Sequence, residues 1–240
     1  MATRQYLDTY NFAKDIDISK YSVLCCCGGD GSYHEVVNGM LNRPDKLKIP
    51  VAFIGNGSGN DLLRSLGVFD LDKALDFIVK GECIRIDTTR VLMDHESEDT
   101  LPEGNDRLNY CRHMMINSAI AMPAKIANTA IPLKSCCGTK SYELATVWEA
   151  CKRNFRADNF ELFIDDKPVH QPGSHLSTTL LMVCNGKYTG GGMVINPFAT
   201  MNDGLTDVTW ISDPRVNNLK GVAGMLGDAK KKGGTQAYKG

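Results

Sequence analysis

Short apolar runs that end in glycine turns, each followed by a helical pattern, dominate the first third of the chain. Residues 22–27 and 49–54 are too short for helices but suit strands that are buried on both faces. Each run enters a glycine turn, at 28–31 and 55–59, and then a helix with apolar residues at helical spacing. This repeat predicts an α/β domain in which both turns lie at the carboxyl edge of a parallel sheet.

Beyond Gly81, where a third helix is expected to end, apolar and polar residues alternate in several segments. These segments are 84–87, parts of 107–116, 160–164, 178–185 and 205–211. Many strands with few helices predict a second, largely antiparallel β domain. One helix is expected within it over 139–154, with an apolar stripe of Leu144, Val147, Trp148 and Cys151, and another over 213–232.

The first glycine turn carries the candidate chemistry. Ser32 and Glu35 have the spacing of a capping box, which predicts a helix start at Ser32. A glycine turn that enters a helix N-terminus attracts anions. Asp30 within the turn would repel a phosphate unless a metal ion lies between them or the carboxylate handles a proton, and this combination suggests phosphoryl transfer. The three adjacent cysteines at 25–27 are expected to pack in the core.

Composition narrows the class of protein. The chain has 240 residues, of which 42% are hydrophobic and 23% charged, as in soluble globular proteins. Its net charge of −1 argues against a general nucleic-acid or anionic-membrane binder. Nine cysteines without a secretory signal indicate a reducing, cytoplasmic location. No apolar run approaches the roughly 20 residues that a transmembrane helix needs.

Four motifs taken together resemble the diacylglycerol kinase catalytic domain superfamily, which includes diacylglycerol, sphingosine and ceramide kinases and bacterial relatives. They are Gly28-Gly29-Asp30-Gly31, Gly57-Ser58-Gly59-Asn60-Asp61, Ile86-Asp87, and the stretch from Gly190 to Val208. The resemblance implies a doubly wound ATP-binding α/β domain over 1–85, similar to phosphofructokinases and NAD kinases. A mainly antiparallel β-sandwich domain for the lipid substrate would follow over 86–240, with the active site between the two. We expect the first domain to be truncated at its start and the second at its end.

The resemblance also implies roles for individual residues. Asp30 and Asp203 would be catalytic, and which of the two is the base stays open. Asp30 and Asp207 would face Mg²⁺. The residues that would bind ATP lie in the two glycine turns and the helices after them: Gly28, Gly29, Gly31, Ser32, Gly57, Ser58, Gly59, Asn60, Asp61 and Arg64.

These residues predict an ATP-dependent lipid kinase that transfers the γ-phosphoryl group to a lipid hydroxyl at a membrane surface, with Mg²⁺. Diacylglycerol and sphingoid or ceramide lipids are the candidate substrates. Residues 117–124 lack the acidic residue with which sphingosine kinases recognise the substrate amine. Two alternatives stay open: an NAD kinase-like phosphotransferase and a catalytically inactive nucleotide- or lipid-binding module. We expect no nucleic-acid partner, and we leave peripheral membrane association and oligomeric state open.

Overall fold

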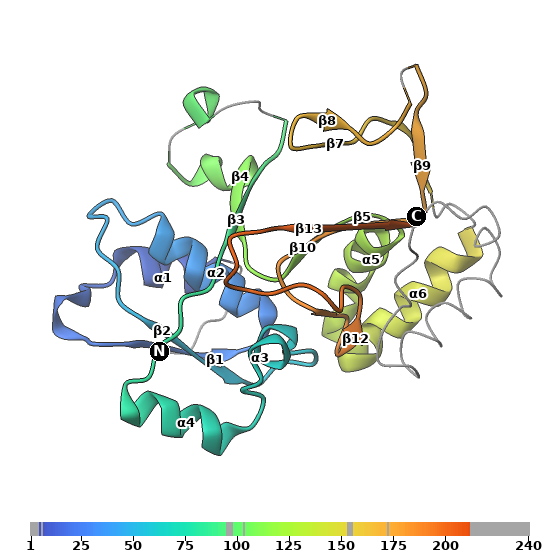
Figure 1. Ribbon diagram of the computed structural model, residues 1–240. Coiled ribbons are helices and arrows are strands. Elements are labelled where there is room, and N and C mark those ends of the chain that lie inside the picture. Colours follow the sequence, from blue (N-terminus) through green and yellow to red (C-terminus); the bar gives the residue numbers. More distant parts are fainter. Residues whose placement is uncertain are drawn as a thin grey trace. The chain divides into compact units, whose positions relative to one another are not determined.

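The protein forms two compact units in the computed structural model, which describes residues 5, 7–94, 98–102, 104–152, 156–171 and 173–211 (Figure 1). Unit 1 comprises residues 1–116, 185–192 and 198–206, and unit 2 comprises residues 117–184, 193–197 and 207–240. Unit 1 is therefore assembled from three separate segments of the chain. The predicted domain boundary after residue 85 stays a prediction, and the predicted helix over 213–232 lies outside the described residues.

The beginning of unit 1 repeats strand and helix as predicted. Its elements are α1 (Asp8–Asp15), a 3-10 turn η1 (Ile18–Lys20), β1 (Leu24–Gly28), α2 (Asp30–Leu41), β2 (Val51–Gly55), α3 (Asp61–Leu66) and α4 (Leu71–Lys80). Strands β1 and β2 pair in parallel, with Gly28 opposite Gly55 at their carboxyl ends. Both glycine turns therefore leave the same edge of the sheet. Gly67 and Gly81 end α3 and α4 with a φ of 68°, the left-handed conformation that favours glycine.

The rest of unit 1 adds an antiparallel pair, β3 (Thr89–Leu92) and β4 (Cys111–Met114). The 3-10 turns η2 (Glu98–Thr100) and η3 (Gly104–Asn109) lie between these strands in the chain, and β11 (Tyr188–Thr189) comes from a later segment. The strand predicted over 84–87 is not formed, because pairing with β4 starts only at Thr89. Asn38 of α2 connects that helix to β4. Its side-chain amide donates to the His113 carbonyl and accepts a hydrogen bond from the His113 backbone N–H.

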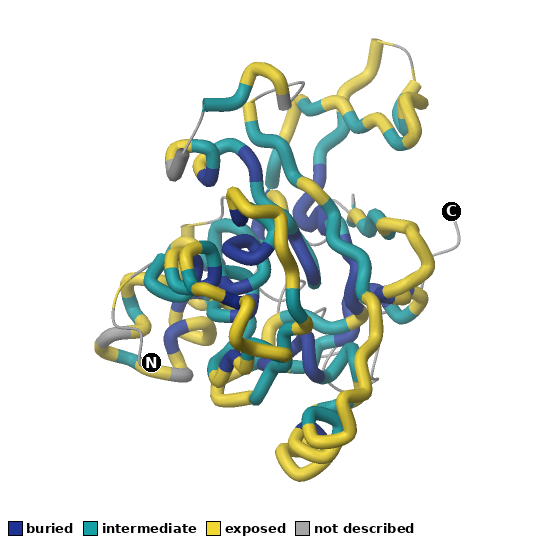
Figure 2. The backbone as a smooth tube through the Cα atoms, turned by 90° about the vertical axis from the view of Figure 1, so that its left-hand side faces the viewer, coloured by how far each residue is buried: buried dark blue, intermediate teal, exposed yellow. Residues whose placement is uncertain are grey.

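The core of unit 1 lies between α1, α2, α3 and one face of the β1–β2 sheet. Figure 2 distinguishes the buried parts of the backbone, in dark blue, from the exposed parts, in yellow. Tyr33 is fully buried there, and its hydroxyl donates to the carbonyls of Gly28 and Ile54 at 2.7 and 2.9 Å. Cys26 faces the same core. The prediction that all three adjacent cysteines are buried is wrong: Cys25 and Cys27 are exposed because side chains alternate across a strand and the core covers one face.

Helix α2 starts two residues before the predicted capping box. Gly29 is its N-cap, Asp30 is the first helical residue, and no side chain caps the first turn. Ser32 therefore lies within the first turn, and the predicted start at Ser32 is wrong. Glu35 instead accepts the Leu7 N–H at 3.5 Å. His34 on the same helix has its pKa lowered to about 4, mainly by burial and further by the nearby charge of Arg112.

Unit 2 contains a three-stranded antiparallel sheet in the order β13–β10–β5 (Figure 1). Its elements are β5 (Asn117–Ala121), α5 (Met122–Cys137), a 3-10 turn η4 (Gly138–Lys140), α6 (Ser141–Lys152), β6 (Ala157–Phe160), β7 (Phe163–Ile164), β8 (Lys167–Pro168), β9 (Leu176–Thr178), β10 (Leu180–Cys184), β12 (Met193–Val194) and β13 (Asp207–Ile211). Strands β6 and β9 pair with each other, and β7 and β8 form a hairpin with Asp165 and Asp166 at φ of 50° and 60°. An α/β part followed by antiparallel sheets confirms the predicted fold class.

The two helices of unit 2 differ from the prediction. Helix α5 was not predicted, although its proline in the first turn is compatible with a helix start. Helix α6 has the predicted apolar stripe, but the stripe is exposed, and the opposite side with Ala145 and Ala150 is buried. None of the helices that the structure describes is long and apolar enough to cross a membrane.

Candidate active site

The two glycine turns of unit 1 touch each other through their backbones. A Cβ placed on Gly29 would lie 2.9 Å from the Gly57 Cα, and one placed on Gly57 would lie 2.5 Å from the Gly29 Cα. Neither position can hold a side chain without moving the backbone of the other. The residue types at 29 and 57 are therefore required by the close approach of the two turns.

Asn60 shapes the second turn. Its side chain accepts the Gly57 N–H at 3.0 Å and donates to the Gly57 carbonyl at 2.9 Å, which closes a ring of two hydrogen bonds. Asn60 is buried, and its φ of 52° is left-handed, a conformation that asparagine tolerates better than most residues. The amide therefore fixes the backbone just before α3 begins.

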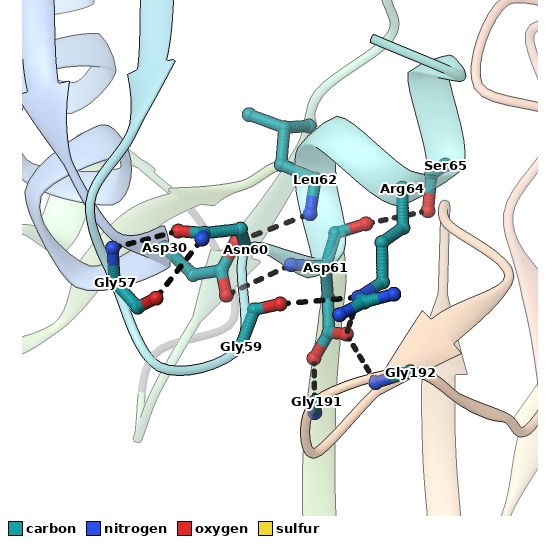
Figure 3. A network of polar contacts seen from close by, with 10 residues as sticks. All are labelled: Asp30, Gly57, Gly59, Asn60, Asp61, Leu62, Arg64, Ser65, Gly191 and Gly192. Carbon is teal, nitrogen blue, oxygen red and sulfur yellow. Dashed lines mark hydrogen bonds and ion pairs between the residues drawn. The ribbon is translucent and has the colours of Figure 1, made fainter. Parts of the chain in front are cut away.

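Asp30 connects the first turn to the second. Its two carboxylate oxygens accept the N–H groups of Asp61 and Leu62 at 3.0 and 3.1 Å (Figure 3). Those N–H groups belong to the first turn of α3, where no intrahelical partner exists. Asp30 therefore caps α3 from another helix, in addition to any chemical role.

Asp61 makes the corresponding connection to a third glycine turn. Its side chain accepts the N–H groups of Gly191 and Gly192 at 2.9 and 2.8 Å (Figure 3). These glycines have φ of 86° and 105°, and successive N–H groups in such a turn form a concave anion-binding site. Here the anion is the protein's own carboxylate. Arg64 Nε lies 3.9 Å from the same carboxylate and donates to the Gly59 carbonyl at 3.2 Å.

The surroundings of Asp61 oppose its ionisation. Burial raises the pKa of the Asp61 carboxyl most strongly, and the nearby Asp30 charge raises it further. The N–H groups of Gly191 and Gly192 and the charge of Arg64 act in the opposite direction. Arg64 itself stacks on Phe69, with its guanidinium carbon 4.3 Å from the ring centroid. The half-buried Arg64 is therefore held between the Phe69 ring and the Gly59 carbonyl, and it lies near the Asp61 carboxylate at the outer limit of an ion pair.

The later aspartates make other contacts. Asp203 is exposed and accepts the Leu205 N–H at 3.0 Å, so its carboxylate closes its own turn. Within unit 1, that turn is connected to Asp87, which accepts the Gly204 N–H at 2.7 Å. Within the part of the chain that the structure describes, no hydrogen bond joins Asp203 to Asp30 or Asp61. Asp207 is the first residue of β13 in unit 2, opposite Cys184.

The site combines turns that suit phosphate with few carboxylates that suit a metal. In the first turn of α2, the N–H groups of Asp30, Gly31 and Ser32 have no helical partners, and the space next to Gly31 is open. The described residues contain no group of three or more His, Cys, Asp or Glu side chains that could hold a metal ion. Magnesium usually binds one or two carboxylates and completes its shell with phosphates and water. The residues present therefore fit a magnesium–nucleotide complex but not a metal cage made of protein alone.

The sequence did not identify the partners of these aspartates. The N–H groups of Leu62, Gly191 and Gly192 have no side-chain signature, and 130 residues separate Asp61 from Gly191. The three consecutive glycines at 190–192 were the available signal, because they allow a close approach of backbone. The structure brings together most of the predicted ATP-binding residues, from Gly28 to Arg64, in unit 1. Their contact with a nucleotide stays a prediction.

Two family matches cover most of the chain. Residues 1–91 match the diacylglycerol kinase catalytic domain, and residues 119–223 match the YegS C-terminal NAD kinase beta sandwich-like domain. These two matches confirm the resemblance to the diacylglycerol kinase catalytic domain superfamily that the motifs predicted.

Individual relatives agree with this assignment. A probable lipid kinase YegS-like from Pectobacterium atrosepticum is 26% identical over 215 residues, which cover 88% of this chain and 63% of that protein. Sphingosine kinase 2 from Arabidopsis thaliana is 34% identical over 111 residues, or 44% of this chain and 21% of that protein. A diacylglycerol kinase structure from Bacillus anthracis superimposes with a TM-score of 0.61 at 23% identity, covering 96% of this chain and 67% of that one, and shows the shared fold. The chain thus spans less than two thirds of the Pectobacterium relative.

Proposed function

We propose that this protein is an ATP-dependent lipid kinase, which moves the γ-phosphoryl group of ATP to the hydroxyl of a diacylglycerol or a related lipid. The observation that carries the proposal is the connection of three glycine turns by Asp30 and Asp61 within one unit. Phosphoryl transfer depends on positioning and on charge stabilisation more than on covalent chemistry, and rigid backbone turns supply both. The relatives named lipid kinase and sphingosine kinase support the lipid as acceptor.

In this proposal each part of the site has a separate task. The N–H groups at the start of α2 would hold phosphate oxygens, and the second turn would lie against them because Gly29 and Gly57 touch. Arg64 would balance phosphate charge. Magnesium, when bound with ATP, would neutralise charge on the phosphates, and Asp30 is the candidate carboxylate for it in unit 1. Asp207 stays a prediction for that role.

Asp30 would also receive or orient the proton of the lipid hydroxyl. Each of its oxygens accepts one N–H, which leaves a second lone pair on each for this purpose. Asp203 is the alternative base, and its exposure in a turn leaves its second oxygen accessible. The two roles differ in one measurable respect: the carboxylate of Asp30 also supports α3, whereas that of Asp203 supports only its own turn.

The decisive experiment measures turnover and ATP affinity separately in Asp30→Asn and Asp203→Asn. If Asp30 is the base, Asp30→Asn should lower turnover by about a hundredfold or more, with a much smaller change in ATP affinity measured by calorimetry. If Asp30 only supports α3, ATP affinity and turnover should decrease together. Asp203→Asn keeps an amide oxygen for the Leu205 N–H, so a loss of turnover there would reflect chemistry and not folding.

The acceptor is tested with radiolabelled ATP and four acceptors in parallel: diacylglycerol, sphingosine, ceramide and NAD. Transfer to a lipid is the expected result. Transfer to NAD alone would replace the proposal by an NAD kinase-like activity. ATP binding without transfer to any of the four would identify a nucleotide-binding module without turnover.

A further inference from the structure

Phe69 places an aromatic ring against the guanidinium of Arg64. The guanidinium carbon lies 4.3 Å from the ring centroid, although Phe69 is 52% exposed. In the other cation–ring contacts among the described residues, the cation is a lysine that lies 5.2 to 5.9 Å from the centroid. A planar guanidinium can stack on an aromatic face, whereas an ammonium acts as a point charge. The contact with Phe69 is the shortest of these, and it involves the arginine of the candidate active site.

The backbone around Phe69 explains why its ring lies there. The two N–H groups that follow α3 donate to the carbonyls of Arg64 and Leu63 at 3.1 and 3.0 Å, which is the Schellman arrangement at a helix end. Asp70 then caps α4 by accepting a backbone N–H of its first turn at 3.0 Å. The short connection between the two helices is therefore fixed at both ends. Phe69 lies between these caps, close in sequence to the last turn of α3.

Two further contacts set the orientation of the guanidinium. Its Nε donates to the Gly59 carbonyl at 3.2 Å, which belongs to the second glycine turn. A Cβ placed on Gly192 would lie 3.4 Å from the guanidinium carbon, so the third glycine turn also lies against it (Figure 3). An aromatic ring and two glycine turns of unit 1 therefore surround the charged end of Arg64.

The terminal nitrogens of this guanidinium, Nη1 and Nη2, remain available. In the part of the chain that the structure describes, the hydrogen bond and the ion pair of Arg64 both involve Nε. The carboxylate of Asp61 beside it already accepts the N–H groups of Gly191 and Gly192. The N–H groups on Nη1 and Nη2 form the fork that pairs with two oxygens of one phosphate. An arginine that is held in place while its fork is unused is prepared for an anion.

We propose that Phe69 is a positioning residue for the phosphates of the bound nucleotide and that it acts through Arg64. The ring holds the guanidinium in one orientation before ATP arrives, so less conformational freedom is lost on binding. Leucine would fill a similar space, but it lacks the negative face that attracts the cation. The inference rests on the proposed function, because it takes this side of unit 1 as the part that binds ATP.

The test measures binding of ATP to the full chain by calorimetry at constant magnesium. Phe69→Leu should raise the dissociation constant by about two- to fivefold, the ratio that corresponds to a cation–π contact at a partly exposed site. Phe69→Tyr keeps the aromatic face and should bind ATP as the wild type does. Tripolyphosphate is the second probe, because it carries phosphates without a nucleobase. Phe69→Leu should weaken its binding by the same factor.

A double-mutant cycle tests whether Phe69 acts through Arg64. Arg64→Lys keeps the charge but removes the planar fork, and it should weaken ATP binding by about tenfold. Once the guanidinium is absent, the ring has nothing to orient. Phe69→Leu should therefore have no further effect on ATP binding in the Arg64→Lys background.

Phe163→Leu is the matched control, because Phe163 is 55% exposed and lies on the β7–β8 hairpin of unit 2. It should leave the binding of both probes unchanged. Thermal unfolding should not distinguish Phe69→Leu from wild type, since the side chain is half exposed. In steady-state assays Phe69→Leu should raise KM for ATP and leave kcat within about twofold, as expected when only binding is affected.

Four results would overturn the inference. They are an unchanged ATP affinity in Phe69→Leu, an equal loss in Phe163→Leu, the same loss from Phe69→Leu in the Arg64→Lys background, and a loss for ATP that tripolyphosphate does not share. The last result would assign the ring to the nucleobase instead of the phosphates.

Failure of this inference can be distinguished from failure of the proposed function. Binding of ATP that depends on Phe69, without phosphorylation of any lipid, would refute the lipid kinase and leave the positioning role intact. Phosphorylation of a lipid with an ATP affinity that Phe69→Leu does not change would do the reverse.

Discussion

The replacement of Asp61 by asparagine tests the connection between the second and third glycine turns. Asparagine has nearly the same shape, but it offers one acceptor oxygen where the carboxylate offers two. In the variant, the N–H of Gly191 or of Gly192 would face an amide NH₂ group. Asp61 is only 6% exposed, so water cannot easily replace the lost acceptor.

The size of the effect follows from the two hydrogen bonds of 2.8 and 2.9 Å. A hydrogen bond to a charged group contributes about 1.5–3 kcal/mol, and a buried donor without a partner costs about 1–3 kcal/mol. In Asp61→Asn one of these hydrogen bonds is lost, and the acceptor of the other changes from a charged carboxylate to a neutral amide. One glycine N–H is left without a partner. Relief of the raised pKa of Asp61, which burial imposes, offsets part of this cost. The connection should weaken by roughly 2–4 kcal/mol.

Amide hydrogen exchange measures this locally. Exchange at Gly191 and Gly192 should accelerate by roughly 30-fold to 1,000-fold in Asp61→Asn, which is the same free energy expressed as a ratio. Asp166→Asn is the control, because Asp166 lies in the exposed β7–β8 turn, where asparagine also adopts a positive φ. Unchanged exchange at both glycines in Asp61→Asn would refute the assigned role of this carboxylate.

Three further predictions concern unit 1. Gly57→Ala places a Cβ 2.5 Å from the Gly29 Cα and should destabilise the unit by about 1–3 kcal/mol. In the control Gly31→Ala, the new Cβ meets nothing within 4 Å, so stability should not decrease. Thermal unfolding compares the two variants, and equal melting temperatures would contradict the contact between the turns. Tyr33→Phe removes a fully buried hydroxyl that donates to two carbonyls and should lower the free energy of unfolding by about 1–3 kcal/mol in denaturant titrations; an unchanged midpoint would refute the bridge. In the folded state the pKa of His34 is about 4, whereas in the unfolded chain it is near its ordinary value of 6.5. Between these two values the unfolded chain binds a proton that the folded chain does not, so stability should decrease as the pH falls through this interval. His34→Gln should remove about 1–3 kcal/mol of that decrease, and identical pH profiles of the two proteins would contradict the shift.

The sequence predicted the elements whose signals are local. Gly81 ends α4 where expected, because a left-handed residue after a helix is a single-residue requirement. The parallel pair β1–β2 followed from two apolar runs before two glycine turns. Helix α5 did not follow, because Pro132 in its interior argues against a helix that tertiary packing nevertheless supports.

Other features depend on what covers an element, which local patterns do not contain. Periodicity located the apolar stripe of α6, but the buried Glu149 determines which side faces inward. The apolar run of β1 predicted a strand buried on both faces, but burial of Cys25 and Cys27 would require cover on a second face. The motifs also located Asp30 and Asp61 without identifying their hydrogen-bond partners. Those partners are backbone N–H groups from distant parts of the chain, which any residue except proline could supply.

The division of unit 1 into three segments has a consequence for biosynthesis. Residues 117–184 of unit 2 are translated between the first segment and the glycine turn that Asp61 holds. At about 5–20 residues per second, the ribosome needs on the order of ten seconds to pass from Asp61 to Gly192. During that interval the nascent chain can form β1, β2 and their helices, but the Asp61 carboxylate has no glycine N–H to accept. The connection between Asp61 and this glycine turn is therefore completed late in translation, after most of unit 2 has been synthesised.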